Sequence, residues 1–343
     1  MKTHNNILFT KNLAIGYPEK GRNKNILQNH LNLGLKAGEL ACLLGPNGCG
    51  KSTLIRTLSG FHKSIAGEIR IFNRLLSEMS SAEISRIISV ALTEPTDVSN
   101  MSVFEVVAFG RSPYTGFLGK LGKSDFEIIQ KSLGNAGISH LHNRQFNQLS
   151  DGEKQKVMIA KSLAQETSVM FLDEPTAFLD FPSKIEILQL LRQTAWEHQK
   201  AILLTTHDLN LALKFADKIW LMGVGVPVIT GVPEDLILNN EFGKYFDNEK
   251  TRFDVTSGSF TIEAKDTGKV IVEGVGLKYE WLVKALLRKG FRVLSSENPF
   301  SEVPFITVKP ENENVFELKV SGTVYEFNTV AELLEKMTDF SGI

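Results

Sequence analysis

One segment near the N-terminus, residues 38–57 (GELACLLGPNGCGKSTLIRT), restricts the possible folds more than any other. Leu40–Leu44 is a short apolar run, which is typical of a strand buried on both faces of a parallel sheet. A glycine-rich turn follows, and Ser52–Leu58 begins a helix. This strand–loop–helix order predicts an α/β fold with the loop at the end of the strand.

Two further apolar runs repeat this pattern. Val169–Leu172 follows an amphipathic stretch, Glu153–Ala164, in which apolar side chains recur at roughly helical spacing. Ala201–Thr205 follows a helix that we expect over Ser183–His198. Strands that alternate with helices indicate an α/β sheet.

The glycine-rich turn matches the P-loop pattern G-x-x-x-x-G-K-[ST]. Its glycines let successive backbone N–H groups face phosphate oxygens at a helix N-terminus. Lys51 would reach the β- and γ-phosphates of a nucleotide, and the Ser52 hydroxyl would bind Mg²⁺. Small-molecule kinases, GTPases, motors and transport ATPases all carry such a loop. The residues expected to bind the nucleotide here are Gly45, Asn47, Gly48, Cys49 (through its backbone only), Gly50, Lys51, Ser52 and Thr53.

Two carboxylates follow the second apolar strand, in the sequence VMFLDEP. Asp173 at the strand end would hold Mg²⁺ through water, and Glu174 would polarise the attacking water. A solvated acidic turn is the alternative. The P-loop upstream favours the catalytic interpretation.

The sequence Leu149-Ser150-Asp151-Gly152-Glu153 opens the amphipathic helix. Ser150 is expected to cap the helix, and Glu153 three residues later completes a capping box. A capped helix N-terminus is also a site for anions, so the structural and functional interpretations are compatible.

Taken in order, the motifs GPNGCGKST, LSDGE, VMFLDEP, AFLD (177–180) and Thr206-His207-Asp208 resemble those of an ABC-transporter ATPase. The resemblance covers about residues 7–245. Within that family, GRSPYTGFLGKL (110–121) and the run from LSDGEKQKVMIAKSLAQET through DEPTAFLD resemble importers of iron–siderophore, haem or cobalamin complexes.

The resemblance implies a P-loop NTPase cassette that acts as a head-to-tail homodimer. Each ATP would lie between the P-loop of one copy and Ser150, Gly152 and Glu153 of the other. Asp180 would lie at the dimer interface, and His207 would contact the γ-phosphate. Glu174, His207 and Lys51 are therefore the expected catalytic residues. Integral-membrane permease subunits would be the direct partners, and a substrate-binding protein would be an indirect partner through the permease.

Tyr17 lies about 28 residues before the P-loop, where the family has an aromatic residue that stacks on adenine. A core or strand-edge tyrosine is the alternative. The sequence also departs from the family pattern. Thr93, with Glu94 beside it, occupies the position of a glutamine that binds Mg²⁺, so Thr93 is the expected ligand there. In the signature, Asp151 and Glu153 replace a glycine and a glutamine; we expect Asp151 to point outward and the helix N-terminus to offset Glu153.

Composition limits the other possibilities. The formal net charge of −1 gives no sign of nucleic-acid binding, and 343 residues suffice for a large core without disulfides. Cys42 and Cys49 have no zinc-site spacing and indicate a reducing compartment. No signal peptide and no run of about 18 apolar residues is evident. We therefore expect a soluble cytoplasmic protein, and the resemblance to ABC-transporter ATPases implies that it works as a peripheral protein on the cytoplasmic face of the inner (cell) membrane.

We expect two domains, an ATPase domain over residues 1–248 with a helical subdomain at about 96–150, and a small α+β domain over residues 249–343. The second contains several short strand-like runs and two helical stretches, Tyr279–Lys289 and Val330–Met337, and shows no ligand site. Two competing functions stay open: a soluble, non-transport ABC ATPase, and a regulatory nucleotide-binding module with weak hydrolysis. Glu174 argues against the regulatory module, because nucleotide binding alone needs no water-polarising carboxylate.

Overall fold

The computed structural model describes residues 6–18, 24–91, 100–116, 119–247, 251–255, 258–262, 267–294, 303–309 and 315–339. The chain forms two compact units. The first comprises residues 1–248 with 253–260, and the second comprises residues 249–252 with 261–343.

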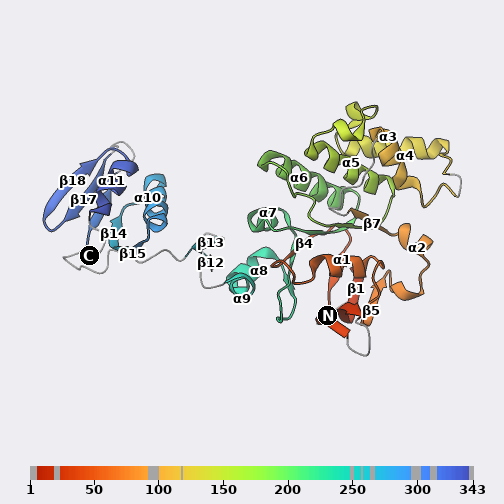
Figure 1. Cartoon of the computed structure of the whole chain (residues 1–343), viewed down its shortest axis with the longest axis horizontal. Coiled ribbons are helices and arrows are strands. Elements are labelled where there is room, and N and C mark those ends of the chain that lie inside the picture. The colour runs from red at the N-terminus through yellow and green to blue at the C-terminus, as the bar shows by residue number, and fades with distance from the viewer. Residues whose placement is uncertain are drawn as a thin grey trace. The chain divides into compact units, whose positions relative to one another are not determined.

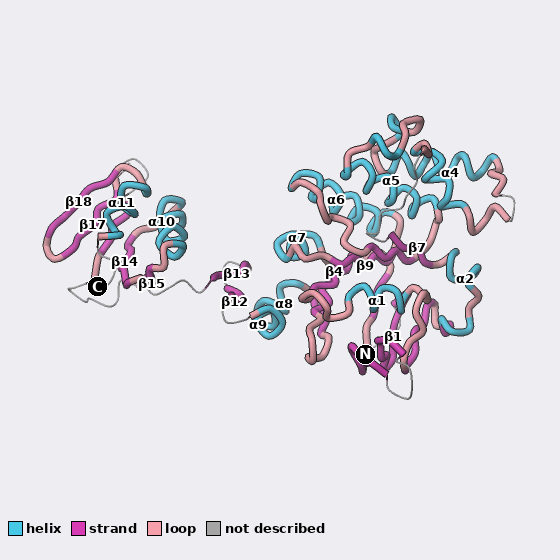
Figure 2. The backbone as a smooth tube through the Cα atoms, viewed as in Figure 1, coloured by secondary structure: helices cyan, strands magenta, loops and turns pink. Residues whose placement is uncertain are grey.

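A largely parallel sheet forms the centre of the first unit (Figures 1 and 2). Its strands run parallel except for the edge strand β11, which pairs antiparallel with β10. The side chains of its two central strands are buried on both faces, which explains their uninterrupted apolar sequences. In spatial order the strands are β11 (Ile229–Gly231), β10 (Lys218–Leu221), β4 (Leu40–Leu44), β9 (Ala201–Thr205), β8 (Val169–Leu172) and β7 (Ile88–Ala91).

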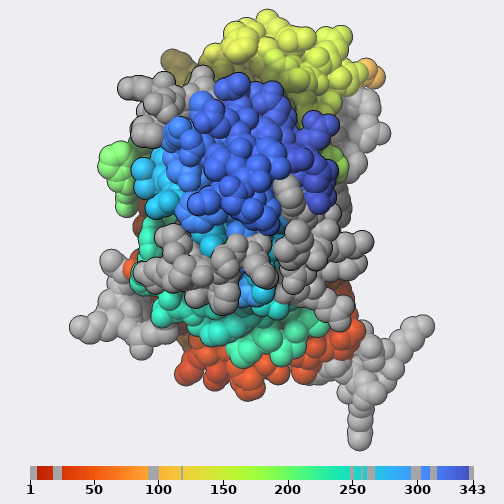
Figure 3. Space-filling model, turned by 90° about the vertical axis from the view of Figure 1, so that its left-hand side faces the viewer, coloured from red at the N-terminus to blue at the C-terminus, as the bar shows by residue number. Residues whose placement is uncertain are grey.

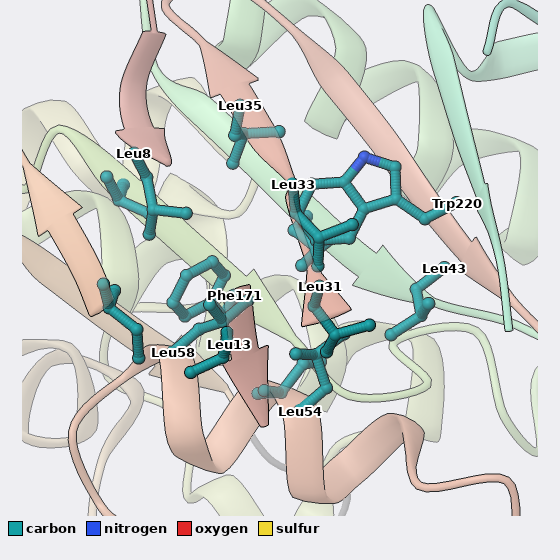
Figure 4. Packing of buried hydrophobic residues seen from close by; sticks show 14 of the residues in the cluster. Leu8, Leu13, Leu31, Leu33, Leu35, Leu43, Leu54, Leu58, Phe171 and Trp220 are labelled. Atoms are coloured by element: carbon teal, nitrogen blue, oxygen red, sulfur yellow. The ribbon is translucent and has the colours of Figure 1, made fainter. Parts of the chain in front are cut away.

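One face of this sheet is covered by α1 (Lys51–Leu58) and by a second, antiparallel sheet. Figure 4 shows Leu54 and Leu58 of α1 packed with side chains of both sheets, including Phe171 of β8. The second sheet has the order β2 (Lys24–Leu31), β1 (Asn6–Pro18), β5 (Ala66–Ile71) and β6 (Arg74–Leu75), with β3 (Gly34–Lys36) also paired to β1. The short helices η1 (Leu76–Glu78) and α2 (Ser81–Ser85) follow it.

Helices cover the opposite face. Their apolar side chains and the alternate side chains of the sheet, among them Leu40, Cys42 and Leu44, form a second core cluster. The helices of this face are α5 (Asp151–Ala164), α6 (Phe181–Glu197), α7 (Leu209–Phe215), α8 (Pro233–Leu238) and α9 (Glu241–Phe246). The strands β12 (Thr251–Asp254) and β13 (Ser259–Ile262) pair with each other, and Phe253 of β12 belongs to the same cluster.

The insertion between β7 and β8 is helical, as the predicted fold class requires. It packs around one side of α5 and is tied together by Arg111, whose buried guanidinium donates to Asp125 Oδ1, Ala164 O and Glu166 Oε2 at 2.8 Å each. The N–H of Gly122 and the Arg111 guanidinium hold the pKa of Asp125 below its usual value. The elements are α3 (Val103–Ala108), η2 (Phe109–Arg111), α4 (Lys123–Asn135), η3 (Ser139–Leu141) and η4 (Phe146–Gln148).

The second unit has its own sheet and core, and appears as a compact blue body in Figure 3. Helices α10 (Leu277–Arg288) and α11 (Val330–Thr338) contribute Leu282, Leu286 and Leu333 to that core. The sheet order is β15 (Phe291–Leu294), β14 (Gly268–Glu273), β16 (Phe305–Val308), β17 (Phe316–Val320) and β18 (Thr323–Phe327). The mixed sheet with helices on both faces and the separate α+β unit confirm the predicted fold class.

None of the helices in the described ranges combines the length and the apolar composition that spanning a bilayer requires.

Phe171 is fully buried where the two sheets and α1 meet. We expect Phe171→Ala to lower the free energy of unfolding by about 3–5 kcal/mol, because the truncation leaves a cavity in a close-packed core. Phe61→Ala is the matched control, since the Phe61 side chain is 62% exposed. Urea unfolding followed by circular dichroism measures both changes. Similar losses for the two variants would contradict this account of the core.

Candidate functional site

The sequence motifs meet at one edge of the central sheet. The P-loop follows β4, the Asp173–Glu174 pair follows β8, and His207 comes two residues after the end of β9. These three strands are parallel, and β9 lies between the other two. Their carboxyl ends therefore face the same way, which is where open α/β sheets bind ligands.

The P-loop has a backbone that requires glycine at several positions. A Cβ at Gly45 would lie 2.0 Å from Met222 O, so the chain approaches too closely for a side chain. Gly48 and Gly50 have φ values of +80° and +106°, in the region that favours glycine. The Lys51 side chain is buried and donates to Gly45 O at 2.8 Å and Pro46 O at 3.1 Å. The loop thus holds its lysine over its own turn.

Helix α1 begins directly after this loop. Its N-cap is Gly50, and no acidic residue occurs in its first turn. Gly50 has no side chain to cap this end, so backbone N–H groups of the first turn and the positive end of the helix dipole can serve an anion. Ser52 is exposed on the first turn, with its hydroxyl accessible to a cation. These features fit a nucleotide phosphate.

Tyr17, at the end of β1, lies against this helix. Its hydroxyl is 2.8 Å from Thr53 Oγ1, and its half-exposed ring meets the His62 ring edge-on with a centroid distance of 6.1 Å. The residue is therefore fixed next to the P-loop helix while part of its ring remains exposed. An adenine-stacking role for Tyr17 stays a prediction.

The two carboxylates are held by neighbours on β9. The Thr205 hydroxyl donates to Asp173 Oδ1 at 2.6 Å and accepts from the Glu174 N–H at 2.7 Å. Glu174 Oε1 lies 2.5 Å from His207 Nε2, and the Glu174 backbone has φ of +49°, which is rare for a residue other than glycine. Strain of this kind concentrates at functional sites.

Sequence reasoning missed Thr205. Its signal was a polar residue, now seen to be fully buried, at the end of an otherwise apolar strand. Thr93 and Glu94 lie outside the described residues, so the Mg²⁺ ligand expected at Thr93 stays a prediction.

Two cysteines lie close to the site. Burial raises the pKa of Cys42 to about 12, and burial also raises the pKa of Cys49 in spite of the nearby Lys51 cation. Both are therefore protonated thiols near neutral pH. This agrees with the view that Cys49 contributes its backbone alone.

The remaining predicted residues form a second group. Ser150 caps α5: its hydroxyl accepts from the Glu153 N–H at 3.3 Å, while Glu153 Oε2 accepts from the Ser150 N–H at 2.8 Å. The predicted capping box is confirmed. Asp151 points outward, as expected, and its carboxylate is 3.2 Å from Lys154 Nζ.

Asp180 caps the neighbouring helix α6, accepting from the Ser183 N–H at 3.2 Å. A Cβ at Gly152 would lie 3.2 Å from Ser183 Oγ, so the two helices begin side by side. Ser150, Gly152, Glu153 and Asp180 thus gather at the adjoining ends of α5 and α6, apart from the residues that line the pocket described next.

A pocket of about 250 Å³ opens beside the P-loop. Its polar lining comes from Asn47, Thr206 and His207. The rest of the lining is Leu44, Gly45, Pro46, Leu209, Phe246 and Phe260. The last two come from α9 and β13, a part of the chain in which the sequence indicated no site.

The sequence matches two family models. Residues 28–177 match the ABC transporter family, and residues 267–338 match the iron ABC transporter C-terminal domain.

Individual proteins similar to this chain are also ATP-binding subunits or cassettes of ABC transporters. An ABC transporter ATP-binding protein of Methanocaldococcus jannaschii is 37% identical over 257 residues, which are 75% of this chain and 87% of that protein. The iron(3+)-hydroxamate import ATP-binding protein FhuC of Bacillus subtilis is 36% identical over 62% of this chain and 77% of its own length. A dimeric structure of a bacterial ABC transporter cassette superposes with a TM-score of 0.56 at 26% identity, covering 66% of this chain and 98% of that one.

The capping box makes part of the stability depend on pH. The Ser150 N–H, helped by the Ser150 hydroxyl, Arg144 and His140, lowers the pKa of Glu153 from its ordinary 4.5. A depressed folded-state pKa gives stabilisation that is present above the unfolded value and lost as pH falls through the folded value. We therefore expect Glu153→Gln to flatten the fall in unfolding free energy below about pH 4.5.

Ser150→Ala is the companion variant, because it removes the cap and should cost about 1 kcal/mol at pH 7. Urea titrations between pH 3 and pH 7 measure both effects. An unchanged pH profile in Glu153→Gln would contradict the role given to this carboxylate.

Proposed function

The chain belongs to the family of ABC transporter ATP-binding proteins, and we propose that it powers import of an iron–siderophore, haem or cobalamin-type complex through a separate membrane permease. The observation that carries the ATPase assignment is the meeting of the P-loop, Glu174 and His207 at one edge of the sheet. The experiment that tests it is hydrolysis of ATP by variants at these positions.

Each residue has a role that its surroundings permit. The N–H groups from Gly45 to Thr53 and the Lys51 ammonium would bind the phosphates of ATP, with Lys51 exchanging the carbonyls of Gly45 and Pro46 for phosphate oxygens. Tyr17 would support the base. Bound Mg²⁺ would neutralise charge on the phosphates, and Ser52 and Asp173 would hold it.

A protein-bound Mg²⁺ usually keeps several waters and phosphate oxygens, so one or two protein oxygens suffice. That fits the finding that the described residues contain no cluster of three or more metal-binding side chains.

Glu174 is the residue that would orient water and accept its proton. His207, 2.5 Å away, would hold that carboxylate and contact the γ-phosphate. Thr205 is a positioning residue, because it fixes both Asp173 and the backbone of Glu174.

The second group of residues points to a second copy of the chain. Ser150, Gly152 and Glu153 lie at the adjoining starts of α5 and α6 and line no part of the pocket beside the P-loop. In a head-to-tail homodimer they would complete the site of the partner, with Asp180 at the interface. A similar cassette has a dimeric structure, which supports the pairing of two copies.

The other partner would be an integral-membrane permease, supplied with cargo by a substrate-binding protein. The chain would then work at the cytoplasmic face of the inner membrane. FhuC, whose name gives iron(3+)-hydroxamate import, and the match to an iron ABC transporter C-terminal domain support an iron chelate as cargo. The first unit, residues 1–248 with 253–260, would carry ATP hydrolysis, and the second unit has no assigned task in it.

We expect Glu174→Gln to reduce the rate of ATP hydrolysis about 10²–10⁴-fold, because it removes the general base. Binding of ATP should persist, since Glu174 does not belong to the phosphate loop. Phosphate release and equilibrium binding of a fluorescent ATP analogue measure the two quantities. Glu234→Gln, an exposed carboxamide substitution on α8, is the control. Equal hydrolysis by Glu174→Gln and the unaltered protein would refute the catalytic assignment.

Import is tested in cells. A strain dependent on this chain should take up radioactive iron from a ferric siderophore, and replacement by the Glu174→Gln protein should abolish that uptake. Glu234→Gln should support normal uptake. Undiminished iron uptake, combined with loss of ATPase activity in the purified variant, would mean that the cargo is a different compound.

A further inference from the structure

Helix α10 of the second unit has two faces of different character. It covers one face of the second unit's sheet together with α11, and the two helices pack against each other (Figures 1 and 2). Its inner side chains, Leu282 and Leu286, are fully buried in the core of this unit. The side chains turned away from the sheet form its outer face, and the core of the unit does not need them.

This outer face of α10 carries large apolar side chains. Leu277 and Trp281 lie one helical turn apart and are 63% and 59% exposed. Leu287 is also exposed, two turns further along the helix. Lys284 Nζ lies 4.7 Å from the centre of the Trp281 ring, so a cation stands beside the exposed indole. Exposed apolar side chains that gather in one place mark an interaction surface.

A tight turn extends the apolar surface beyond the start of α10. Val275 stands between Gly274 and Gly276 and is 89% exposed. A Cβ at Gly274 would lie 2.7 Å from Val308 Cβ, and Gly276 has φ of +87°, so this turn needs both glycines. The turn therefore presents Val275 to the surroundings just before the first turn of the helix.

Charge separates α10 from its neighbour α11. On the outer face of α10, the exposed cations Lys284 and Arg288 outnumber the single carboxylate Glu280. The exposed side chains of α11, all of whose residues the structure describes, include Glu332 and Glu335 and no large apolar residue. Basic and apolar side chains thus coincide on one helix, and the adjacent helix is acidic. The partner that complements α10 is negatively charged and accepts apolar groups.

We propose that the outer face of α10 binds the surface of an anionic lipid bilayer. Leu277 and Trp281 would enter the boundary between headgroups and acyl chains, where tryptophan is favoured. The long side chains of Lys284 and Arg288 would reach the anionic headgroups. This inference rests on the proposed function, which supplies the nearby membrane, and it gives the second unit a task apart from ATP hydrolysis.

The attachment would be weak and reversible. Binding of an interfacial helix scales with the apolar area it buries and with its attraction to anionic lipid, and α10 has only 12 residues. A bilayer also needs no shape complementarity, so it accepts apolar side chains that are spread along a helix and a turn. Such contact suits a chain whose main attachment would be the permease.

The tryptophans of the chain offer a direct test. Of the three, Trp220 is buried, whereas Trp196 on α6 and Trp281 are exposed. In the full-length Trp196→Phe protein, we expect vesicles of phosphatidylcholine with about one third phosphatidylglycerol to shift the emission to shorter wavelength. Lipid brominated in the acyl chains should quench that emission. The matched control is Trp281→Phe, which keeps the exposed Trp196 and should show neither change.

Sedimentation with the same vesicles measures the strength of binding. Trp281→Ala should weaken it about fivefold or more, because the largest apolar side chain of this face is lost. Trp196→Ala, an equal truncation of an exposed tryptophan on the first unit, should bind as the unaltered chain does.

A charge variant covers the case in which Trp281→Ala fails to fold. Lys284→Gln combined with Arg288→Gln should weaken binding about tenfold or more, since each cation near an anionic surface adds to the attraction. Lys123→Gln combined with Lys131→Gln removes two exposed cations from α4 and is the control. Added salt should weaken binding of the unaltered chain, because it screens the headgroup charge.

Three outcomes would overturn the proposal. The first is no binding of the unaltered chain to the anionic vesicles, and the second is equal binding to pure phosphatidylcholine. The third is a nucleotide-free dimer that Trp281→Ala dissociates in analytical ultracentrifugation, which would assign the outer face of α10 to a second copy. Vesicle binding needs neither nucleotide nor permease, so its failure would leave ATP hydrolysis and iron uptake intact. Unchanged hydrolysis by Glu174→Gln would instead refute the proposed function whatever the vesicles show.

Discussion

The position of the candidate site depends on the hydrogen bonds that join β9 to β4 on one side and to β8 on the other. Because all three strands run parallel, the P-loop, His207 and the Asp173–Glu174 pair lie at the same edge of the sheet. More than 150 residues of sequence separate the P-loop from His207. The strands stay in register because both faces of the sheet are buried, by α1 and the antiparallel sheet on one side and by helices on the other. The chemistry at the edge depends on this packing.

A single hydroxyl group on β9, that of Thr205, holds the two candidate carboxylates in place. As the last residue of β9, it occupies a position between the P-loop strand and the carboxylate strand, and its hydroxyl bonds with both Asp173 and Glu174. A valine of similar shape would fill the space and still leave the Glu174 N–H without this acceptor. The positive φ of Glu174 is therefore supported from the neighbouring strand, and this support directs its carboxylate toward His207.

Much of this arrangement could be predicted from the sequence, because the relevant signals are local. Leu40–Leu44, Val169–Leu172 and Ala201–Thr205 are strands with the expected bounds, since short apolar runs between turns and helices leave few alternatives. The resemblance to ABC-transporter ATPases is confirmed by the family match and by the relatives.

Long-range features escaped prediction. Strand β18 went unpredicted because its alternating polar sequence is half exposed at a sheet edge. The sequence pattern places residues 253–260 in the C-terminal domain, whereas they cluster with the first unit, because Phe253 packs on Phe242 at a centroid distance of 5.0 Å. That contact, together with the packing of Phe260 on Phe253 and Phe246, brings β13 to the P-loop pocket. No local sequence pattern predicts this position of β13.

The two carboxylates of the signature, Asp151 and Glu153, disfavour a bound phosphate less than the sequence alone suggests. Two carboxylates near a phosphate-binding helix end would repel an anion if they were free. Each is instead occupied: Asp151 pairs with Lys154, and Glu153 accepts from the Ser150 N–H and lies 3.8 Å from Arg144. The capping box uses the N–H groups of Ser150 and Glu153, so those of Asp151 and Gly152 remain for a phosphate. Helix α1, with only Gly50 at its N-cap, keeps a larger share of its N–H groups available. In the proposed homodimer, the P-loop end of α1 would therefore make the larger contribution to phosphate binding, and the α5 end of the second copy the smaller one.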